Sequence, residues 1–368
     1  MSTRTGRGAM TVGVVAMAVT LAACGGGSKS GDGSDGAAKK KDLKIGLLLP
    51  EKQAARYEKS DKPLIEKMVG ELTSGKGQVV YANAEQDASR QNQQVDDMIA
   101  KKVDALIIDA VDSKAIGGAV QRAKTAGIPV VAFDRLAEGP VDAYVSFDNE
   151  DVGHVQARAL LDNLGEKAKD GQIVMMNGAR TDPNAAQFKK GAHAELDGKV
   201  NIGKEYDTKE WKPENAAANM RSAISALGKN KIIGVYSAND GMAGGIIEAF
   251  KAAGVSKLPP ITGQDTELAG VQRIVAGEQY MSVYKSYAEE SPIAAQMAVA
   301  LAKGQSLISI ANSKTNSPTK SDIPTALVPV VAVIKENIRS TVVSDGLYTI
   351  DEICTAKYKA ACKSAGLM

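Results

Sequence analysis

Short apolar runs recur along the chain, and most are followed by a segment in which apolar residues are spaced as on one face of a helix. The runs are residues 44–49, 78–82, 105–108, 129–133, 143–147, 172–176, 232–237, 260–263 and 281–284. They are nearly continuous, which is typical of strands covered on both faces of a parallel sheet. Between them, Val95, Met98 and Ile99 illustrate the helical spacing. The alternation predicts an α/β fold with right-handed crossovers and doubly wound sheets.

The number of runs and the length of the chain both indicate two domains. At about 150 residues per domain, 368 residues suffice for two, and the runs exceed what one such sheet comfortably uses. The net charge of +2 argues against nucleic acid as a partner, because phosphates need a surplus of Lys and Arg. Two histidines and three cysteines argue against a zinc site, and we expect no metal and no cofactor.

The N-terminus carries the pattern of an export signal. Arg4 and Arg7 precede an uncharged apolar run, residues 10–23, which is too short to remain as a membrane anchor. The run ends in Leu-Ala-Ala followed by Cys24, which resembles a bacterial lipobox. We therefore expect residues 1–23 to be a lipoprotein signal peptide and Cys24 to be lipidated. The alternative is a soluble secreted protein in which Cys24 is incidental.

Residues 24–42 are rich in Gly, Ser and Lys, a composition that cannot bury a core. This segment is predicted to be a flexible tether between a lipid anchor and the folded chain.

Polar side chains follow the predicted strands at the edge where ligands bind in such sheets. The residues singled out are Arg56, Tyr57, Asp134, Arg135, Asn184, Asn239, Asp265 and Lys285, with Trp211 in a loop before a helix. Planar and charged groups can each hold two neighbouring hydroxyls, and an aromatic face packs on the C–H face of a sugar ring. Taken singly, an Asp-Arg pair is usually a solvated turn, and an Asn before a helix is usually a cap. Their joint occurrence at strand ends favours a sugar site.

Six segments carry a resemblance to a known family. They are AFDR at 132–135, YVSFDNE at 144–150, WKPENA at 211–216, AND at 238–240, GQD at 263–265 and VYK at 283–285. With them the sequence resembles the periplasmic-type sugar-binding proteins of ABC importers, in the ribose/xylose class, from Leu43 to about Gly346. The resemblance is greatest to the xylose-binding members.

The resemblance implies a role for each of the nine residues. Arg56 corresponds to a hydroxyl donor and Tyr57 to a stacking face, where the xylose binder used for comparison has Trp. Asp134 and Arg135 match the class's sugar-gripping pair. Asn184 corresponds to an amide of the second lobe and Trp211 to a second aromatic face. The rest of the polar shell corresponds to Asn239, Asp265 and Lys285. Lys285 favours a xylose-type site, whereas Tyr57 leaves the exact sugar open.

The resemblance also implies a type I periplasmic binding protein fold with two lobes and a three-segment hinge. The crossings are expected near residues 147–148, 285–286 and 328–329, so residues 43–147 and 286–328 form the N-terminal lobe, and 148–285 and 329–368 the C-terminal lobe. A monomer anchored outside the cytoplasm would close on a monosaccharide, D-xylose or a related aldose, and deliver it to an ABC permease and its ATPase.

Cys354 and Cys362 lie eight residues apart near the C-terminus. In an exported chain a disulfide between them is plausible, and two free thiols are the alternative.

Other functions remain to be weighed against transport. A sugar-acting enzyme could use the same cleft, but no nucleophile–base pair is identifiable. A transcriptional regulator with this fold needs an N-terminal helix-turn-helix, where this chain has the lipobox and tether. A chemosensory sugar receptor remains open.

Overall fold

The computed structural model describes residues 42–368. The predicted signal peptide, Cys24 and all but the last residue of the tether lie outside the described residues. Within residues 42–368, no helix has the length and apolar character needed to cross a bilayer.

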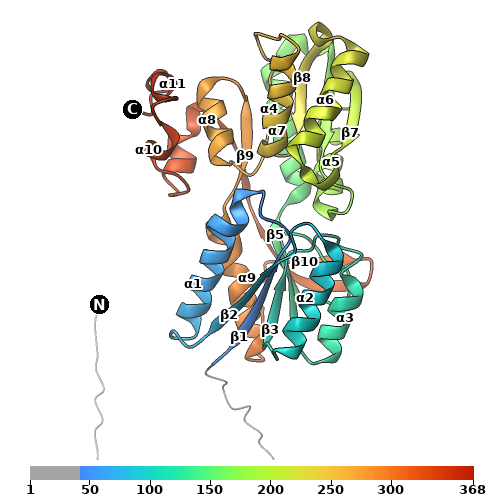
Figure 1. The fold of residues 1–368 in the computed structure, drawn as a ribbon, viewed down its shortest axis with the longest axis vertical. Helices are drawn as coiled ribbons and strands as arrows, with labels where there is room; N and C mark the ends of the chain where they lie inside the picture. The colour runs from blue at the N-terminus through green and yellow to red at the C-terminus, as the bar shows by residue number, and fades with distance from the viewer. Residues whose placement is uncertain (1–41) are drawn as a thin grey trace, which may run out of the picture. The chain divides into compact units, whose positions relative to one another are not determined.

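The first lobe contains a seven-stranded sheet (Figure 1). In spatial order its strands are β10 (Ser313–Ser317), β11 (Lys320–Val328), β5 (Ala143–Phe147), β4 (Val130–Phe133), β3 (Ala105–Ile108), β1 (Lys44–Leu49) and β2 (Gln78–Asn83). Every pairing is parallel except that of the edge strand β10 with β11. Parallel pairing points the carboxyl ends of β1, β3 and β4 to the same edge.

Helices cover both faces of this sheet, which explains why its strands are continuously apolar. On one face α1 (Lys62–Leu72) and α9 (Tyr287–Ala302) pack over Leu47 and Leu49. On the other face α2 (Ala88–Ala100) and α3 (Gly117–Thr125) pack over Leu48. Successive side chains of β1 thus enter two separate cores, as the alternation of a strand requires.

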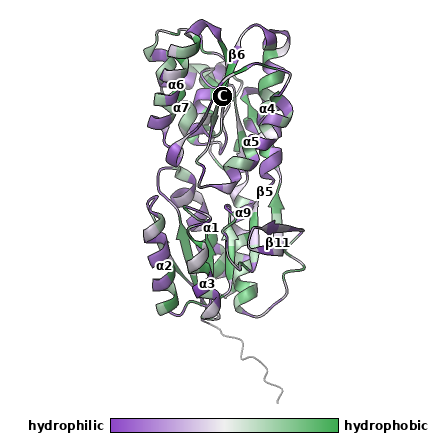
Figure 2. Ribbon diagram, turned by 90° about the vertical axis from the view of Figure 1, so that its right-hand side faces the viewer, coloured by the Kyte–Doolittle hydropathy of each residue, from purple (hydrophilic) through white to green (hydrophobic). Residues whose placement is uncertain are grey.

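The second lobe has a central parallel sheet extended by isolated bridges. The strands β7 (Ile202–Asp207), β6 (Gln172–Asn177) and β8 (Ile232–Ser237) pair in that order. Bridges from Val235 to Ile261 and from Gln264 to Val283 continue it to β9 (Met281–Lys285), which pairs with the antiparallel β12 (Val330–Ile334). Two helix pairs flank β6 in Figure 2, namely α4 (Asn149–Leu164) with α5 (Pro183–Leu196), and α6 (Pro213–Leu227) with α7 (Asp240–Ala252).

The chain passes between the two sheets at three places. It leaves β5 of the first sheet for α4, returns from β9 to α9, and leaves β11 for β12. Pro329 separates β11 from β12, and its missing N–H cannot continue a strand ladder.

The predicted fold class is confirmed, since two parallel-sheet lobes are joined by three segments. Each predicted apolar run coincides with a strand except residues 260–263, which form isolated bridges rather than a strand. The prediction missed β7, β10, β11 and β12. The sequences of β7 and β10, IGKEYD and SKTNS, lack an apolar run because both are edge strands that are not fully buried.

Short helical turns complete the fold, namely η1 (Tyr57–Asp61), η2 (Gly165–Lys169), η3 (Lys209–Trp211), η4 (Lys229–Lys231), η5 (Lys335–Asn337) and η6 (Arg339–Val343).

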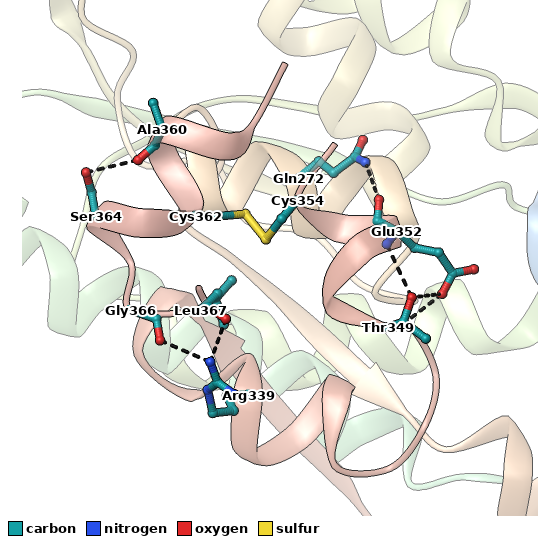
Figure 3. The surroundings of a disulfide bond; sticks show 10 residues. All are labelled: Gln272, Arg339, Thr349, Glu352, Cys354, Ala360, Cys362, Ser364, Gly366 and Leu367. Atoms are coloured by element: carbon teal, nitrogen blue, oxygen red, sulfur yellow. Dashed lines mark hydrogen bonds between the residues drawn. A yellow bond between two sulfur atoms is a disulfide. The ribbon is translucent and has the colours of Figure 1, made fainter. Parts of the chain in front are cut away.

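The C-terminal segment packs on α8 (Leu268–Ala276) and contains α10 (Ile350–Ile353) and α11 (Lys359–Ser364). A disulfide joins Cys354 to Cys362 (Figure 3). The Gln272 amide donates to the Glu352 carbonyl at 3.0 Å, which links the segment to α8. Both sulfurs are buried in an apolar cluster with Val271 and Ile274 of that helix. The disulfide therefore fixes a short segment that has little core of its own.

Replacing Cys354 and Cys362 together by Ser should lower the free energy of unfolding by about 2–3 kcal/mol, because the bond restricts a short loop in the unfolded chain. Chemical denaturation of the double variant measures this loss. Cys24→Ser serves as the matched control and should leave unfolding unchanged. An unchanged free energy in the double variant would show that the segment is held by packing alone.

Candidate functional site

A polar cavity lies between the two lobes, at the carboxyl ends of the strands. It is lined by Glu51, Ala54, Arg56, Tyr57, Asp134, Arg135, Asp182, Asn184, Phe188, Trp211, Ala238, Asn239, Gln264, Asp265 and Lys285. All nine residues singled out from the sequence as ligand-binding are among them. The volume open to the centres of water molecules is about 50 Å³. The cavity is therefore small and large enough to admit water.

Two aspartates of the cavity are held in an unusual backbone conformation. Asp134 directly follows β4 with φ of 56°, and Asp265 has φ of 84°, values that non-glycine residues rarely adopt. The Asp134 carbonyl accepts hydrogen bonds from the Tyr144 hydroxyl at 3.0 Å and the Ser146 hydroxyl at 2.7 Å. The Asp265 carbonyl accepts one from the Tyr287 hydroxyl at 3.0 Å. These bonds hold both carboxylates at the cavity wall despite the backbone strain.

Arg56 lies just before η1 and is buried among three carboxylates. Its Nε donates to Asp61 Oδ2 at 2.7 Å, Nη2 donates to Glu290 Oε2 at 2.7 Å, and Nη1 donates to Asp134 Oδ2. The guanidinium also lies 4.2 Å from the centre of the Tyr287 ring. Burial alone would lower the pKa of Arg56, but the three carboxylates raise it well above its ordinary value.

The guanidinium of Arg56 is therefore fixed by the protein before any ligand contributes. Of its five N–H groups, one on Nη1 keeps no partner among the described residues. Burial would raise the pKa of Asp134, but Arg56, Lys285 and Arg135 lower it, so this carboxylate is favoured as an ionised acceptor.

Arg135 is held by groups from both lobes. Its Nε lies 2.8 Å from Asp182 Oδ2 and 3.5 Å from Asp109 Oδ1, and its Nη1 donates to the Ala110 carbonyl at 3.0 Å. Its Nη2 donates to the Tyr57 hydroxyl at a long 3.4 Å. Burial raises the pKa of Asp109 well above its ordinary value, although the nearby Arg135 opposes this.

Lys285 ends β9 and forms the third cation of the cavity. Its Nζ lies 2.6 Å from Asp265 Oδ1 and between the Phe147 and Phe188 rings, 5.5 and 5.4 Å from their centres. This contact is an ion pair without a hydrogen bond, because Asp265 Oδ1 has no hydrogen-bond partner among the described residues, so the donors of Lys285 and this oxygen remain available to a ligand. The rings exclude water and strengthen the attraction between Lys285 and Asp265.

The second lobe contributes amides and one indole. Asn184 donates from Nδ2 to Asp134 Oδ1 at 2.9 Å, while its own Oδ1 is buried with no hydrogen-bond partner among the described residues. Asn239 caps α7 by accepting from the Met242 amide at 2.8 Å. Asn239 therefore both caps α7 and lines the cavity.

Trp211 lies at the end of η3 with its ring against Gly178. A Cβ at Gly178 would come within 1.9 Å of the indole, so only glycine permits this close approach. The Phe188 ring packs edge-on at 6.4 Å between ring centres. The indole Nε1 is buried without a hydrogen-bond partner among the described residues. A buried indole N–H normally has a partner, so this one is available to a ligand.

The cavity therefore presents several unused donors and acceptors around an aromatic face. Hydroxyl groups both donate and accept, and a ring with several of them matches this inventory. In the part of the chain that the structure describes, no cluster of His, Cys, Asp and Glu side chains is arranged to hold a metal ion.

Sequence reasoning missed several residues of the site. Asp61 and Glu290 hold Arg56, Asp109 and Asp182 hold Arg135, and Phe188 packs beside Lys285. Asp109 directly follows β3, so the strand-end rule could have found it. Glu290 and Asp61 carried no such signal, because they sit at helix starts and meet Arg56 only in the folded chain.

Two parallel-sheet lobes with a polar cavity between them define a binding protein that holds a small solute. The comparisons agree, since residues 45–306 match the family described as "Periplasmic binding protein domain". The D-xylose-binding periplasmic protein of Haemophilus influenzae is 36% identical over 319 residues, 85% of this chain and 92% of that protein. The protein of the same name from Escherichia coli K12 is 36% identical over 86% of this chain and 94% of its own.

A solved structure shows the same fold. The ABC transporter solute-binding protein of Clostridium phytofermentans, solved with bound β-D-glucose, is 26% identical with a TM-score of 0.78, over 84% of this chain and 99% of that one. This chain belongs to the periplasmic binding protein family, among the sugar-binding proteins of ABC importers. It is a binding protein and not an enzyme.

Behind Asn239, Asp240 is a fully buried acid that should make stability depend on pH. Its Oδ2 accepts from the Ser282 hydroxyl and the Glu267 amide, both at 2.9 Å. Burial raises the pKa of Asp240 from 3.8 to about 7. A folded-state pKa above the unfolded value means that the folded chain binds the extra proton between about pH 4 and pH 7. The contribution of Asp240 to stability is thus largest below pH 4 and is lost as the pH rises to 7.

The variant Asp240→Asn cannot ionise and should lack this dependence. We expect the difference in unfolding free energy between the variant and the native chain to move in favour of the variant as the pH rises from 4 to 8. Urea denaturation at several pH values measures the difference. A constant difference across this range would contradict a raised pKa at Asp240.

Proposed function

We propose that this protein captures one monosaccharide, D-xylose foremost, in the cavity between its lobes and delivers it to an ABC permease. The carrying observation is the convergence of nine strand-end and loop residues on one small cavity. Relatives named for D-xylose binding support the choice of sugar at 36% identity. The charge inventory supports a neutral ligand, because the cations are already paired with carboxylates.

In this proposal the first lobe forms hydrogen bonds with one side of the sugar ring. Asp134 accepts from sugar hydroxyls, while Arg135 and the remaining Nη1 hydrogen of Arg56 donate to them. The Tyr57 hydroxyl, which contacts Arg135, keeps that guanidinium from turning away. The ring of Tyr57 provides an apolar boundary for the sugar.

The second lobe and the crossing at Lys285 grip the other side. Asp265 and Lys285 act as an acceptor and a donor side by side, and Asn184 and Asn239 provide amide groups. The Trp211 ring packs on the C–H face of the sugar, with its Nε1 donating at the edge. Charged partners inside a closed cavity discriminate strongly against ligands that leave them unpaired.

The lobes are proposed to close by rotation about the three crossings. Residues 43–147 with 286–328, and 148–285 with 329–368, move as the two bodies. A sugar that contacts both bodies binds the closed state better and shifts the equilibrium toward it. The permease then recognises the closed form outside the cytoplasm.

The N-terminal sequence supports lipid anchoring as part of this function. A lipid on Cys24 and the tether would keep the receptor beside its permease. A single acyl chain binds a bilayer only marginally, so stable attachment requires more than one chain.

Calorimetric titration against a panel of pentoses and hexoses tests the sugar. We expect D-xylose to bind most tightly, and no binding by any monosaccharide would contradict the proposal. Asp265→Ala should weaken binding by roughly 2–5 kcal/mol, because Lys285 and a sugar hydroxyl are left unpaired in a closed cavity. It should also reduce the sugar-induced decrease in radius of gyration.

The control is Asp322→Ala, which removes a similar Asp–Lys pair at the surface, with Lys314 at 3.4 Å. Exposed pairs contribute little, so this variant should bind sugar normally. If Asp265→Ala binds and compacts as the control does, the second-lobe part of the site is wrong.

Lipid anchoring is tested by Cys24→Ser. The variant should appear in the soluble or culture fraction, whereas the native chain sediments with membranes. A variant that stays on membranes after a salt wash would contradict anchoring through Cys24.

A further inference from the structure

One short segment of the second lobe touches the first lobe directly, away from the three crossings. The Thr181 carbonyl accepts a hydrogen bond from the Ser113 amide at 3.3 Å. Asp182 Oδ2 lies 2.8 Å from Arg135 Nε, and Asn184 Nδ2 donates to the Asp134 carbonyl at 3.0 Å. We call residues 181–184 the bridging turn. These contacts do not satisfy every polar atom of the turn, because Asn184 Oδ1 has no hydrogen-bond partner among the described residues.

The bridging turn is preorganised by the start of α5. Asp182 is the N-cap of this helix, and its Oδ1 accepts from the Asn184 amide at 2.9 Å. Its second oxygen, Oδ2, is the one that faces Arg135. This contact is an ion pair rather than a hydrogen bond, because Arg135 Nε has no hydrogen-bond partner among the described residues, and Asp182 also lines the cavity.

The pair formed by Asp182 and Arg135 is buried and unites the two lobes. Asp182 is 4% exposed and Arg135 is 6% exposed. The first lobe supplies Asp109 as a second carboxylate, but Asp109 Oδ1 is farther from Arg135 Nε, at 3.5 Å. Opening the cleft would separate Asp182 from Arg135 and leave the guanidinium to turn toward Asp109. The closed arrangement therefore holds Arg135 in one orientation.

We propose that Asp182 is a positioning residue that orients Arg135 for the sugar and favours the closed state before the sugar binds. The inference takes the identity of the ligand from the proposed function. The effect expected on the sugar-free protein does not depend on that function. The observed affinity falls in proportion to the population of the binding-competent state. Removing the Asp182 charge thus weakens sugar binding by lowering the population of the closed state.

The test is Asp182→Asn in the full chain. Asparagine is an equally good N-cap, so α5 keeps its start while the charge opposite Arg135 is lost. The matched control is Asp87→Asn, because Asp87 caps α2 in the same way, through the Arg90 amide at 3.0 Å, but at the exposed end of a first-lobe helix. Asp182→Ser, which also retains a capping oxygen, is used if the first variant does not fold.

We expect Asp182→Asn to weaken D-xylose binding about 30-fold or more in calorimetry, as for loss of one partner of a buried charged pair. The sugar-free variant should have a larger radius of gyration than the sugar-free native chain, whereas both should be equally compact with saturating sugar. Asp87→Asn should match the native chain in both measurements. If Asp182 only stabilised the start of α5, the variant would not have a larger radius of gyration in the sugar-free state alone.

An unchanged radius of gyration in the sugar-free variant would overturn the proposal, whatever the affinity. Native affinity in the variant would overturn it as well. If the native chain bound no sugar at all, the proposed function would fail, and the comparison of sugar-free proteins would still decide the role of Asp182.

Discussion

The burial of Arg56 among Asp61, Asp134 and Glu290 is the interaction on which the site depends. A guanidinium removed from water is costly unless every charge beside it is compensated and hydrogen-bonded. Here η1, the end of β4 and the start of α9 each supply one carboxylate. Each of these elements is therefore required in its place, because each carboxylate accepts a different N–H of Arg56 and removing one leaves that buried N–H without its partner. This requirement makes the first-lobe half of the site rigid before a ligand arrives.

The same electrostatic constraint continues across the cavity. The first lobe holds Arg135 with Asp109, the second lobe holds it with Asp182, and Lys285 pairs with Asp265 at a crossing. Acids outnumber cations, and burial raises the pKa of Glu290 and Asp109 well above their ordinary values. A ligand that added charge would disturb this balance. A neutral polyol can use the leftover donors and acceptors without doing so, which is why the electrostatics favour a sugar.

Much of this arrangement could be predicted from strand ends. Parallel strands bring their carboxyl ends to one edge of a sheet, so Asp134 and Arg135 could be placed at the ligand edge of the first sheet, and Lys285 at a strand end of the second lobe. The partners of these residues could not, because Glu290 and Asp61 lie in helices and reach Arg56 only through tertiary packing. Edge strands such as β7 were missed for a related reason. They are not fully buried, and their sequence carries no continuous apolar run.

A crystal structure of the protein grown with D-xylose tests the central claim most directly. The account predicts one sugar ring between the lobes, with hydroxyls on Asp134, Arg135, Asp265 and Lys285 and its C–H face on Trp211. Arg56 should keep its three carboxylate partners. A sugar bound elsewhere, or a sugar in the cavity that contacts only one lobe, would contradict the account.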